Sequence, residues 1–461
     1  MRFFLNYFFT FSAIILLTSC ETGDKKTTTY FGGKIINPKT NFVVLHNQDK
    51  VIDSLFLDDD NRFMGKYENF KEGLYHFKHG PEYQYAYIEP QDSILIRLNT
   101  WDFDESLVFS GKGAGKNNIL IDCFVESEKD VKNYTLYSFY NLKPTAFKVK
   151  LDSVLALKQL KINAFKAKNS ALSDDYLLLL DIAAKYPIYN RFERYTEVHR
   201  RKMRVTTSPK VGSTFYNYRK NINTNKDSLI IFGPYSRYIL ERLHNDAYSK
   251  GMTPDKKDFI ITLLNSANKN ISNEKLKNTF LKNILINDFY KKSSCAVDKK
   301  AFYTFFKLSS DIDDKKHVQR LLNDVTAIRK GSKIHNFKII DYNKTTHRIQ
   351  KLIKGKNSVL YFWNPKYISS SYLTSRINHL SQKFPKVTFI GIKFATTNFE
   401  LVKGIDIKNQ YYIEQSSKAN LFLTSKLPRT LLVSKKGVLS NGYTSINSRM
   451  INVQLEKLQK N

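Results

Sequence analysis

The chain has 461 residues, and its 74 Lys and Arg outnumber 42 Asp and Glu, which gives a formal net charge of +32. A hydrophobic content of 42%, with 14% aromatic residues, excludes a wholly disordered chain, and only three cysteines exclude a disulfide-rich scaffold. This length predicts two or three domains.

The first residues have the pattern of a secretory signal. Arg2 precedes an apolar run that is too short for a membrane-spanning stop-transfer helix. Leu17-Thr18-Ser19-Cys20 matches the bacterial lipobox, in which the cysteine is acylated and becomes the mature N-terminus. An ordinary signal with a chance cysteine is the alternative. We predict a signal peptide at residues 1–19, a lipidated tether at residues 20–29, and a bacterial cell-envelope location, periplasmic or on the outer-membrane surface. Membrane lipid is then a partner through acylated Cys20.

Residues 30–115 are predicted to form an all-β sandwich. Runs of β-branched and aromatic residues alternate with turn residues at the intervals typical of that fold. The runs are Phe42–Leu45, Val51–Leu57, Leu74–Phe77, Tyr85–Ile88 and Ile94–Leu98.

Two motifs in this region resemble ligand sites but lack required residues. Gly111–Lys116 looks like a phosphate loop, yet Ser110 stands where a glycine is needed and Asn117 where a Ser or Thr is needed for magnesium. Asp58–Asn61 lacks the glycine and the distal glutamate of a calcium loop, so we interpret it as a hairpin turn. We therefore predict no cofactor and no metal.

Residues 116–330 have helical periodicity and are predicted to form an α-helical domain. Asp174–Tyr186 is apolar on all sides, so we expect it to be buried, and Pro187 to end it. The other amphipathic stretches are Leu151–Ala167, Tyr235–Tyr248, Pro254–Ala267, Asn273–Phe289 and Asp314–Arg329.

The basic charge and the cysteines each leave alternatives open. The charge would suggest nucleic acid in a cytosolic protein, but no nucleic-acid motif is present and the export signal removes that partner. The dispersed lysines and the basic run Arg200–Arg204 either contact an anionic lipid surface or form solvated helix faces. Cys123 and Cys295 either form a structural disulfide or are two buried thiols.

The last part of the chain is organised around Asn357–Tyr372. Val359–Trp363 is a continuous apolar run between turn residues, which predicts a strand buried on both faces, as in a parallel sheet. Ser369–Ser371 offer helix N-caps, and apolar residues recur after them at helical spacing. The segment is therefore predicted to be a strand, a short loop and a helix.

This segment resembles a known family. Lys354-Gly355-Lys356 followed by Val-Leu-Tyr-Phe-Trp resembles the entry to the active site of TlpA/ResA-type thioredoxin-like disulfide reductases, which are related to AhpC/TSA proteins. The resemblance continues, in order, through Gly331–Phe337, Val387–Lys393, Leu427–Val433 and Ser448–Leu458. It implies an α/β thioredoxin-like fold for residues 331–461. Residues 30–115 are similar to the small β-domain often found N-terminal to such lipoproteins, so the fold class is multidomain α+β.

The chain departs from that family at the active site. The family's two cysteines would fall at Tyr367 and Ser370. A serine hydroxyl cannot replace a thiolate without a nearby base, so we predict a domain without classical disulfide exchange. The resemblance also implies a cis peptide bond before Pro428 and a vestigial substrate groove, lined by Trp363, Tyr367, Leu427 and Pro428.

The function predicted from these features is a membrane-anchored, redox-inactive thioredoxin-like lipoprotein. It would bind a peptide or protein partner in the vestigial groove. One alternative is a non-classical thiol-disulfide oxidoreductase that uses Cys123 or Cys295. The other is a structural basic spacer at the membrane surface.

Overall fold

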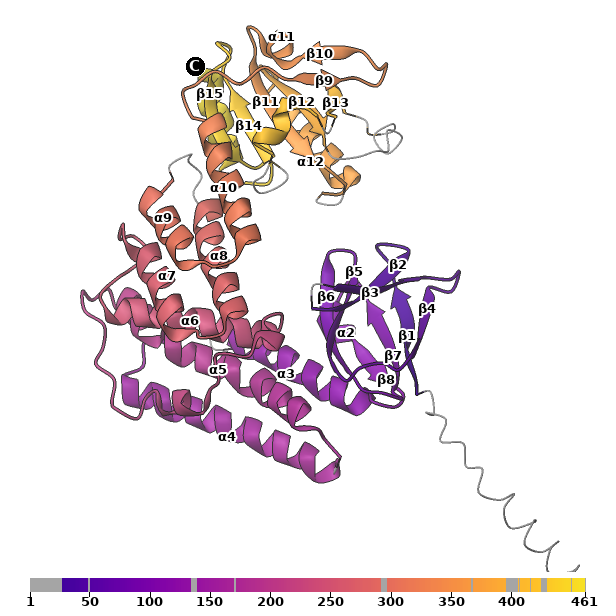
Figure 1. Cartoon of the computed structure of the whole chain (residues 1–461), viewed down its shortest axis with the longest axis vertical. Helices are drawn as coiled ribbons and strands as arrows, with labels where there is room; N and C mark the ends of the chain where they lie inside the picture. The colour runs from indigo at the N-terminus through magenta and orange to yellow at the C-terminus, as the bar shows by residue number, and fades with distance from the viewer. Residues whose placement is uncertain are drawn as a thin grey trace, which may run out of the picture. The chain divides into compact units, whose positions relative to one another are not determined.

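The computed structural model describes residues 27–48, 50–133, 139–169, 171–291, 297–365, 368–394, 405, 407–414, 416–423, 429–448 and 450–460. The chain divides into two compact units, shown in Figure 1 with colours that follow the sequence. The first unit consists of Met1–Ile222 and Ser228–Arg242, and the second of Asn223–Asp227 and Leu243–Asn461. No helix in the described ranges is both long enough and apolar enough to cross a lipid bilayer.

Two four-stranded sheets form a sandwich in the first unit. One sheet has the order β4 (Arg62–Glu68), β1 (Thr28–Ile36), β7 (Ser93–Asn99) and β8 (Val108–Ser110). The other has the order β3 (Lys50–Phe56), β2 (Phe42–Asn47), β5 (Gly73–His79) and β6 (Glu82–Ile88). Alternate side chains of both sheets point inward and share one hydrophobic core, which includes Phe31, Val43, Phe77 and Ile94. The five predicted runs correspond to β2, β3, β5, β6 and β7.

Strand β1 lies outside the predicted runs because two glycines interrupt its apolar pattern. Gly33 has a φ of +153°, and a Cβ there would lie 2.1 Å from the carbonyl oxygen of Ile96 on β7. Glycine at this position therefore allows β1 to lie inside its sheet, parallel to β7 and antiparallel to β4.

The two apparent ligand motifs have structural roles. Asp58–Asn61 connects β3 to β4, which belong to different sheets, so it is a turn between sheets and the hairpin interpretation is wrong. The Asp58 Oδ1 accepts hydrogen bonds from the amides of Asp60 (3.0 Å) and Arg62 (2.8 Å). Asn117 bonds the backbone of Tyr87 in both directions, at 2.6 and 2.8 Å, and so joins the first long helix to β6.

Helices complete the first unit. They are α2 (Phe103–Ser106), α3 (Ala114–Asn133), α4 (Pro144–Lys168), α5 (Asp174–Lys202), the 3₁₀ helices η1 (Asn217–Asn221) and η2 (Asp227–Leu229), and most of α6 (Gly233–Ser249). Helix α5 continues through Pro187, so the prediction that this proline ends the helix is wrong. Proline removes one backbone hydrogen bond. The side chains of Tyr186 and Ile188 on either side of it are buried, and this packing stabilises the helix across the proline.

The second unit contains a helical part and a mixed sheet. The helices are α7 (Phe259–Asn270), α8 (Glu274–Lys291), α9 (Lys299–Leu308) and α10 (Ile312–Ala327). The sheet has the order β10 (Thr346–Arg348), β9 (Lys338–Ile340), β13 (Gln410–Tyr412), β12 (Val387–Lys393), β11 (Asn357–Trp363), β14 (Arg429–Val433) and β15 (Leu439–Thr444). Its accompanying helices are α11 (Ile349–Ile353), α12 (Ser370–Lys383), η4 (Lys418–Leu421) and α13 (Ile451–Lys460).

Each face of this sheet is covered. Side chains of α12 and α13, such as Leu373 and Leu455, pack with Val359 and Tyr361 on one face. Residues after α10 and in α11 pack with Leu360 and its neighbours on the other. Because β11 is parallel to β12 and antiparallel to β14, the predicted strand, loop and helix lie at the centre of an α/β layer structure.

Candidate functional site

The candidate site lies where β11 ends and α12 begins. Every residue of β11 except Asn357 is buried, as the apolar run predicts. Trp363, the last residue of β11, pairs with Lys393, the last residue of β12. The carboxyl ends of the two parallel strands therefore meet at one edge, which is where open α/β sheets bind their ligands.

Two side chains hold the loop between β11 and α12. The Asn364 Nδ2 donates a hydrogen bond to the carbonyl of Phe394 at 3.0 Å, and this ties the end of β11 to the end of β12. Ser369 is the N-cap of α12, because its Oγ accepts a hydrogen bond from the amide of Tyr372 at 3.3 Å. Ser370 then begins the helix and is partly exposed. The partial positive charge of a 14-residue helix is thus located at the end of this loop.

The structure describes one of the four residues predicted to line a peptide groove. Tyr367, Leu427 and Pro428 lie outside the described residues, so the groove and the cis bond before Pro428 stay predictions. Ser370 lies in the first turn of α12, where the resemblance implies the second cysteine position.

Trp363 differs from its predicted role of lining the groove. Its side chain is 0% exposed and packs in the core with Ile368 and Leu373, because it points to the face that α12 covers. The indole Nε1 has no hydrogen-bond partner among the described residues. Trp363 therefore supports the loop through packing and does not present its ring to solvent.

A buried ion pair fixes the start of β14. Arg429 is 1% exposed and pairs with Asp324 of α10, which is fully buried. The Arg429 Nε also donates to the carbonyl of Gly442 at 2.9 Å. The guanidinium lies 4.3 Å from the centroid of the Tyr443 ring, and the Tyr443 hydroxyl donates to Asp324 at 3.1 Å. These contacts hold the backbone that directly follows Pro428.

Sequence reasoning missed this ion pair and one further buried cation. Arg429 begins the apolar run that ends at Val433, and this arginine could have indicated a buried ion pair, because a buried charge requires a partner. The partner Asp324 is 105 residues away and carries no signal of its own. Lys393 is also buried, and burial lowers the pKa of its ammonium group. A buried lysine with a lowered pKa at the end of a central strand is a functional-site candidate.

The described thiol is not at this site. Cys123 is a free cysteine buried in α3, and burial raises the pKa of its thiol to about 11. Roughly one thiol in ten thousand would then be ionised at pH 7. Cys20 and Cys295 lie outside the described residues. No group of three His, Cys, Asp or Glu side chains suited to a metal ion occurs in the described part of the chain.

A hollow in this unit lies on β9 and β10, at the far edge of the sheet from β14. It has a volume of about 590 Å³, and Lys338, Arg348, Lys418 and Glu414 line it. All four side chains are exposed. The hollow is therefore a polar surface depression, separate from the β11–α12 loop.

Two cations of the predicted basic run are paired within their own helix. Arg200 donates two hydrogen bonds of 2.8 Å to the buried carboxylate of Glu197, and Arg201 lies 3.2 Å from the same group. Two of the charges in Arg200–Arg204 therefore stabilise the C-terminal turns of α5.

No protein-family model matches the chain, and no curated protein matches it. Solved structures align with less than a third of the chain. A putative thiol-disulfide oxidoreductase from Bacteroides vulgatus is 17% identical, covers 29% of this chain and 99% of its own, and has a TM-score of 0.25. A putative thiol:disulfide interchange protein DsbE from Chlorobium tepidum is 12% identical, covers 28% of this chain and 98% of its own, and has a TM-score of 0.25. A secreted disulfide oxidoreductase from Mycobacterium tuberculosis is 14% identical, covers 26% of this chain and 95% of its own, and has a TM-score of 0.22.

These similarities are to thiol-disulfide oxidoreductases and extend over less than a third of the chain. Identities and TM-scores this low carry no argument about what the chain does. The observed strand order and register define the C-terminal sheet.

Proposed function

We propose that the chain is a lipid-anchored protein of the bacterial cell envelope whose C-terminal α/β domain binds an extended peptide without exchanging disulfides. The anchor is the acylated Cys20 of the lipobox. The main support for the lack of disulfide exchange comes from the start of α12. Ser369 caps this helix, and Ser370 lies in its first turn.

The chemistry of that position argues against a dithiol mechanism. A cysteine at a helix N-terminus is reactive because the helix dipole lowers its pKa and a thiolate forms near neutral pH. The hydroxyl of Ser370 stays protonated at neutral pH unless a base removes its proton. The described residues of the loop, which are Asn364, Pro365, Ile368 and Ser369, supply no such base.

Cys123 argues against the alternative of a non-classical oxidoreductase. Its thiol is buried and its pKa is raised, so it lacks both the exposure and the ionisation that disulfide exchange needs. Among the described residues, the geometry supports binding better than disulfide exchange through Cys123.

The start of β14 supports peptide capture. Arg429 pairs with Phe362 in the sheet, so β14 begins beside the end of β11, the strand that precedes α12. We expect the predicted loop that carries Pro428 to pair with an extended peptide through its backbone groups. The ion pair with Asp324 holds the first residue of β14 in place.

The first test concerns redox chemistry. The chain from residue 21 onward should not reduce an insulin-type disulfide, and a Cys123→Ser, Cys295→Ser double variant should behave identically. The paired substitutions Tyr367→Cys and Ser370→Cys should create measurable turnover, because they place a dithiol at the N-terminus of α12. Turnover by the unmodified chain clearly above that of the Cys123→Ser, Cys295→Ser variant would contradict the proposal, as would a folded Tyr367→Cys, Ser370→Cys variant that stays inactive.

The second test concerns the peptide site. Extended peptides selected on the chain from residue 21 onward should bind at least about tenfold more weakly to Leu427→Asp. The matched control is Leu421→Asp, which changes an exposed leucine of η4 in the same unit. Equal losses in both variants would show that the peptides do not occupy the predicted groove.

The third test concerns the anchor. Cys20→Ser should leave an unprocessed precursor or a chain released from membranes, because acylation requires the thiol. A Cys20→Ser chain that is processed and still fractionates with membranes at high salt would show that lipidation is not the anchor.

A further inference from the structure

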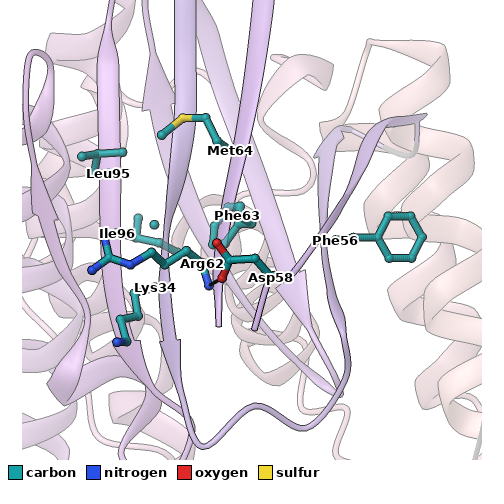
Figure 2. Close-up of a pocket in the computed structure, with 9 residues that line it drawn as sticks. Lys34, Phe56, Asp58, Arg62, Phe63, Met64, Leu95 and Ile96 are labelled. Carbon is teal, nitrogen blue, oxygen red and sulfur yellow. Dashed lines mark hydrogen bonds between the residues drawn. The ribbon is translucent and has the colours of Figure 1, made fainter. Parts of the chain in front are cut away.

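The outer face of the sheet β4-β1-β7-β8 combines cations and exposed apolar side chains in adjacent rows. In the strand register, Lys34 of β1 lies directly opposite Arg62 of β4 on one side and Arg97 of β7 on the other. We call these three residues the cation row. Two residues earlier in β1, on the same face, Gly32 lies opposite Met64 of β4 and Leu95 of β7. We call Met64, Gly32 and Leu95 the apolar row. Figure 2 shows members of both rows on their neighbouring strands.

The cation row is unusual for a sheet. Like charges directly opposite one another on neighbouring strands are destabilising. All three side chains are exposed, and none of them makes an ion pair among the residues that the structure describes. Stability of the sandwich therefore gives no reason for this arrangement, and an external anion would relieve the repulsion.

The apolar row is exposed as well. Met64 is 55% exposed, Leu95 37%, and Val108, opposite Arg97, 55%. Gly32 lacks a side chain, and the Met64 sulfur lies within 2.8 Å of the place where a Cβ would stand, so this methionine lies across β1. A shallow pocket of about 500 Å³ connects the two rows.

The carboxylate in the same pocket does not neutralise the row. Asp58 lines the same pocket as Lys34 and Arg62 (Figure 2), but its Oδ1 already accepts two backbone amides of the turn before β4. One carboxylate also faces two cations in the pocket, and Arg97 adds a third on the same face. The face keeps a net positive charge.

The connection to Cys20 indicates which anion this face meets. Strand β1, which carries Lys34 and Gly32, begins at Thr28. The eight steps of chain from Cys20 to Thr28 span at most about 29 Å when fully extended. An acylated Cys20 would therefore keep the face close to the bilayer that holds it.

We propose that the outer face of the sheet β4-β1-β7-β8 docks on anionic phospholipid headgroups of that bilayer. The cation row contacts the phosphates, while Met64, Leu95 and Val108 enter the headgroup layer. The inference rests on the lipid anchor of the proposed function, and it names the surface through which the body of the protein meets the membrane. Phosphate oxygens suit Lys and Arg, and exposed apolar side chains beside them distinguish a lipid surface from a soluble polyanion.

The test measures binding to vesicles with the chain from residue 21 onward, so that no acyl chain contributes. Vesicles of phosphatidylcholine with an equal part of phosphatidylglycerol should bind it, and vesicles of phosphatidylcholine alone should not. Each cation at an anionic surface changes partitioning about fivefold, so the joint change Lys34→Gln, Arg62→Gln and Arg97→Gln should lower it roughly 100-fold.

The matched control removes three exposed lysines from or beside the other sheet. Lys50→Gln, Lys71→Gln and Lys78→Gln together change the net charge by the same amount. This control should lose less than about fivefold, because its lysines lie away from the docking face. An equal loss in both triple variants would show that only net charge matters and would overturn the proposal.

Three further measurements address the apolar side chains, the folding of the variants and the class of ligand. The joint change Met64→Ser and Leu95→Ser should weaken vesicle binding about tenfold and make the remaining binding more sensitive to salt.

Unfolding temperatures of all variants show whether they fold, and the salt dependence of the unmodified chain tests the electrostatic part of binding without any substitution. Unmodified chain that binds heparin but not anionic vesicles would overturn the proposal in favour of a soluble polyanion. These outcomes do not depend on acylation or peptide capture, so their failure is distinguishable from failure of the proposed function.

Discussion

Two regions of the molecule, the start of β14 and the sheet β4-β1-β7-β8, use their cations in opposite ways. The C-terminal unit buries Arg429 and surrounds it with a carboxylate, a carbonyl and an aromatic ring. The N-terminal sandwich leaves Lys34, Arg62 and Arg97 side by side on an exposed face. A buried charge that loses its partner is strongly destabilising, whereas an exposed charge can be removed with little effect on folding. The comparison separates a cation that maintains the fold from cations that are free to bind.

The largest expected effect is at the buried pair. Asp324→Ala should lower the free energy of unfolding by about 3–5 kcal/mol, because it leaves the Arg429 guanidinium buried without its carboxylate. Denaturant unfolding of the chain measures this. Asp313→Ala, on the same helix, removes a carboxylate in an exposed pair with Lys316 and should change stability by less than about 0.5 kcal/mol. Similar effects in both variants would show that the Asp324 pair does not stabilise the unit.

The next effect is at a buried histidine of the sandwich. The His79 Nε2 accepts a hydrogen bond from the Lys39 amide at 2.9 Å, and its Nδ1 lies 3.1 Å from the carbonyl of Phe42, to which it donates in the neutral ring. Burial lowers the pKa of His79 from its ordinary value of 6.5. His79→Ala should cost about 2 kcal/mol, since the Lys39 amide loses its acceptor.

The sign of the pH dependence follows from that lowered pKa. Just below pH 6.5 the unfolded chain binds a proton at His79 more readily than the folded chain, so the stabilisation present above pH 6.5 is lost as the pH falls. Unfolding of the unmodified chain should therefore become easier from pH 7 toward acid, and His79→Ala should reduce that slope. His335→Ala, at an exposed histidine, should retain it. A slope unchanged in His79→Ala would contradict the assignment.

A smaller effect is expected at the cap of α12. Ser369→Ala should lower the free energy of unfolding by about 1 kcal/mol, because the Tyr372 amide loses its acceptor. Thermal unfolding provides the measurement. Ser371→Ala is the matched control in the same turn, where an exposed serine makes no cap, and it should change stability by only a few tenths of a kcal/mol.

The smallest effect completes the comparison. The joint change Lys34→Gln, Arg62→Gln and Arg97→Gln should leave the free energy of unfolding within about 0.5 kcal/mol of the unmodified value, or raise it slightly, because like charges no longer face one another. Denaturant unfolding in low salt is the most sensitive measurement. A loss of more than about 2 kcal/mol would show that the row maintains the sandwich and would remove its distinction from Arg429.

Several elements could be predicted because their signals are local. The continuous apolar run before Asn364 predicts the buried strand β11, and Ser369 followed by helical spacing predicts the start of α12. The absence of cysteine at Tyr367 and Ser370 is also a property of the sequence alone. Pro187 misled the prediction, since a local rule for helix ends is outweighed where side chains on both sides of the proline are buried.

The sequence by itself therefore determined the strands with clear periodicity, the capped helix and the lack of a dithiol. Only the tertiary structure decided that Trp363 lies in the core, that Arg429 meets Asp324, and that the cation row forms on one face. The physical reason is distance along the chain. Burial and charge pairing depend on which segments pack together, and the residues of these pairs come from strands and helices far apart in sequence.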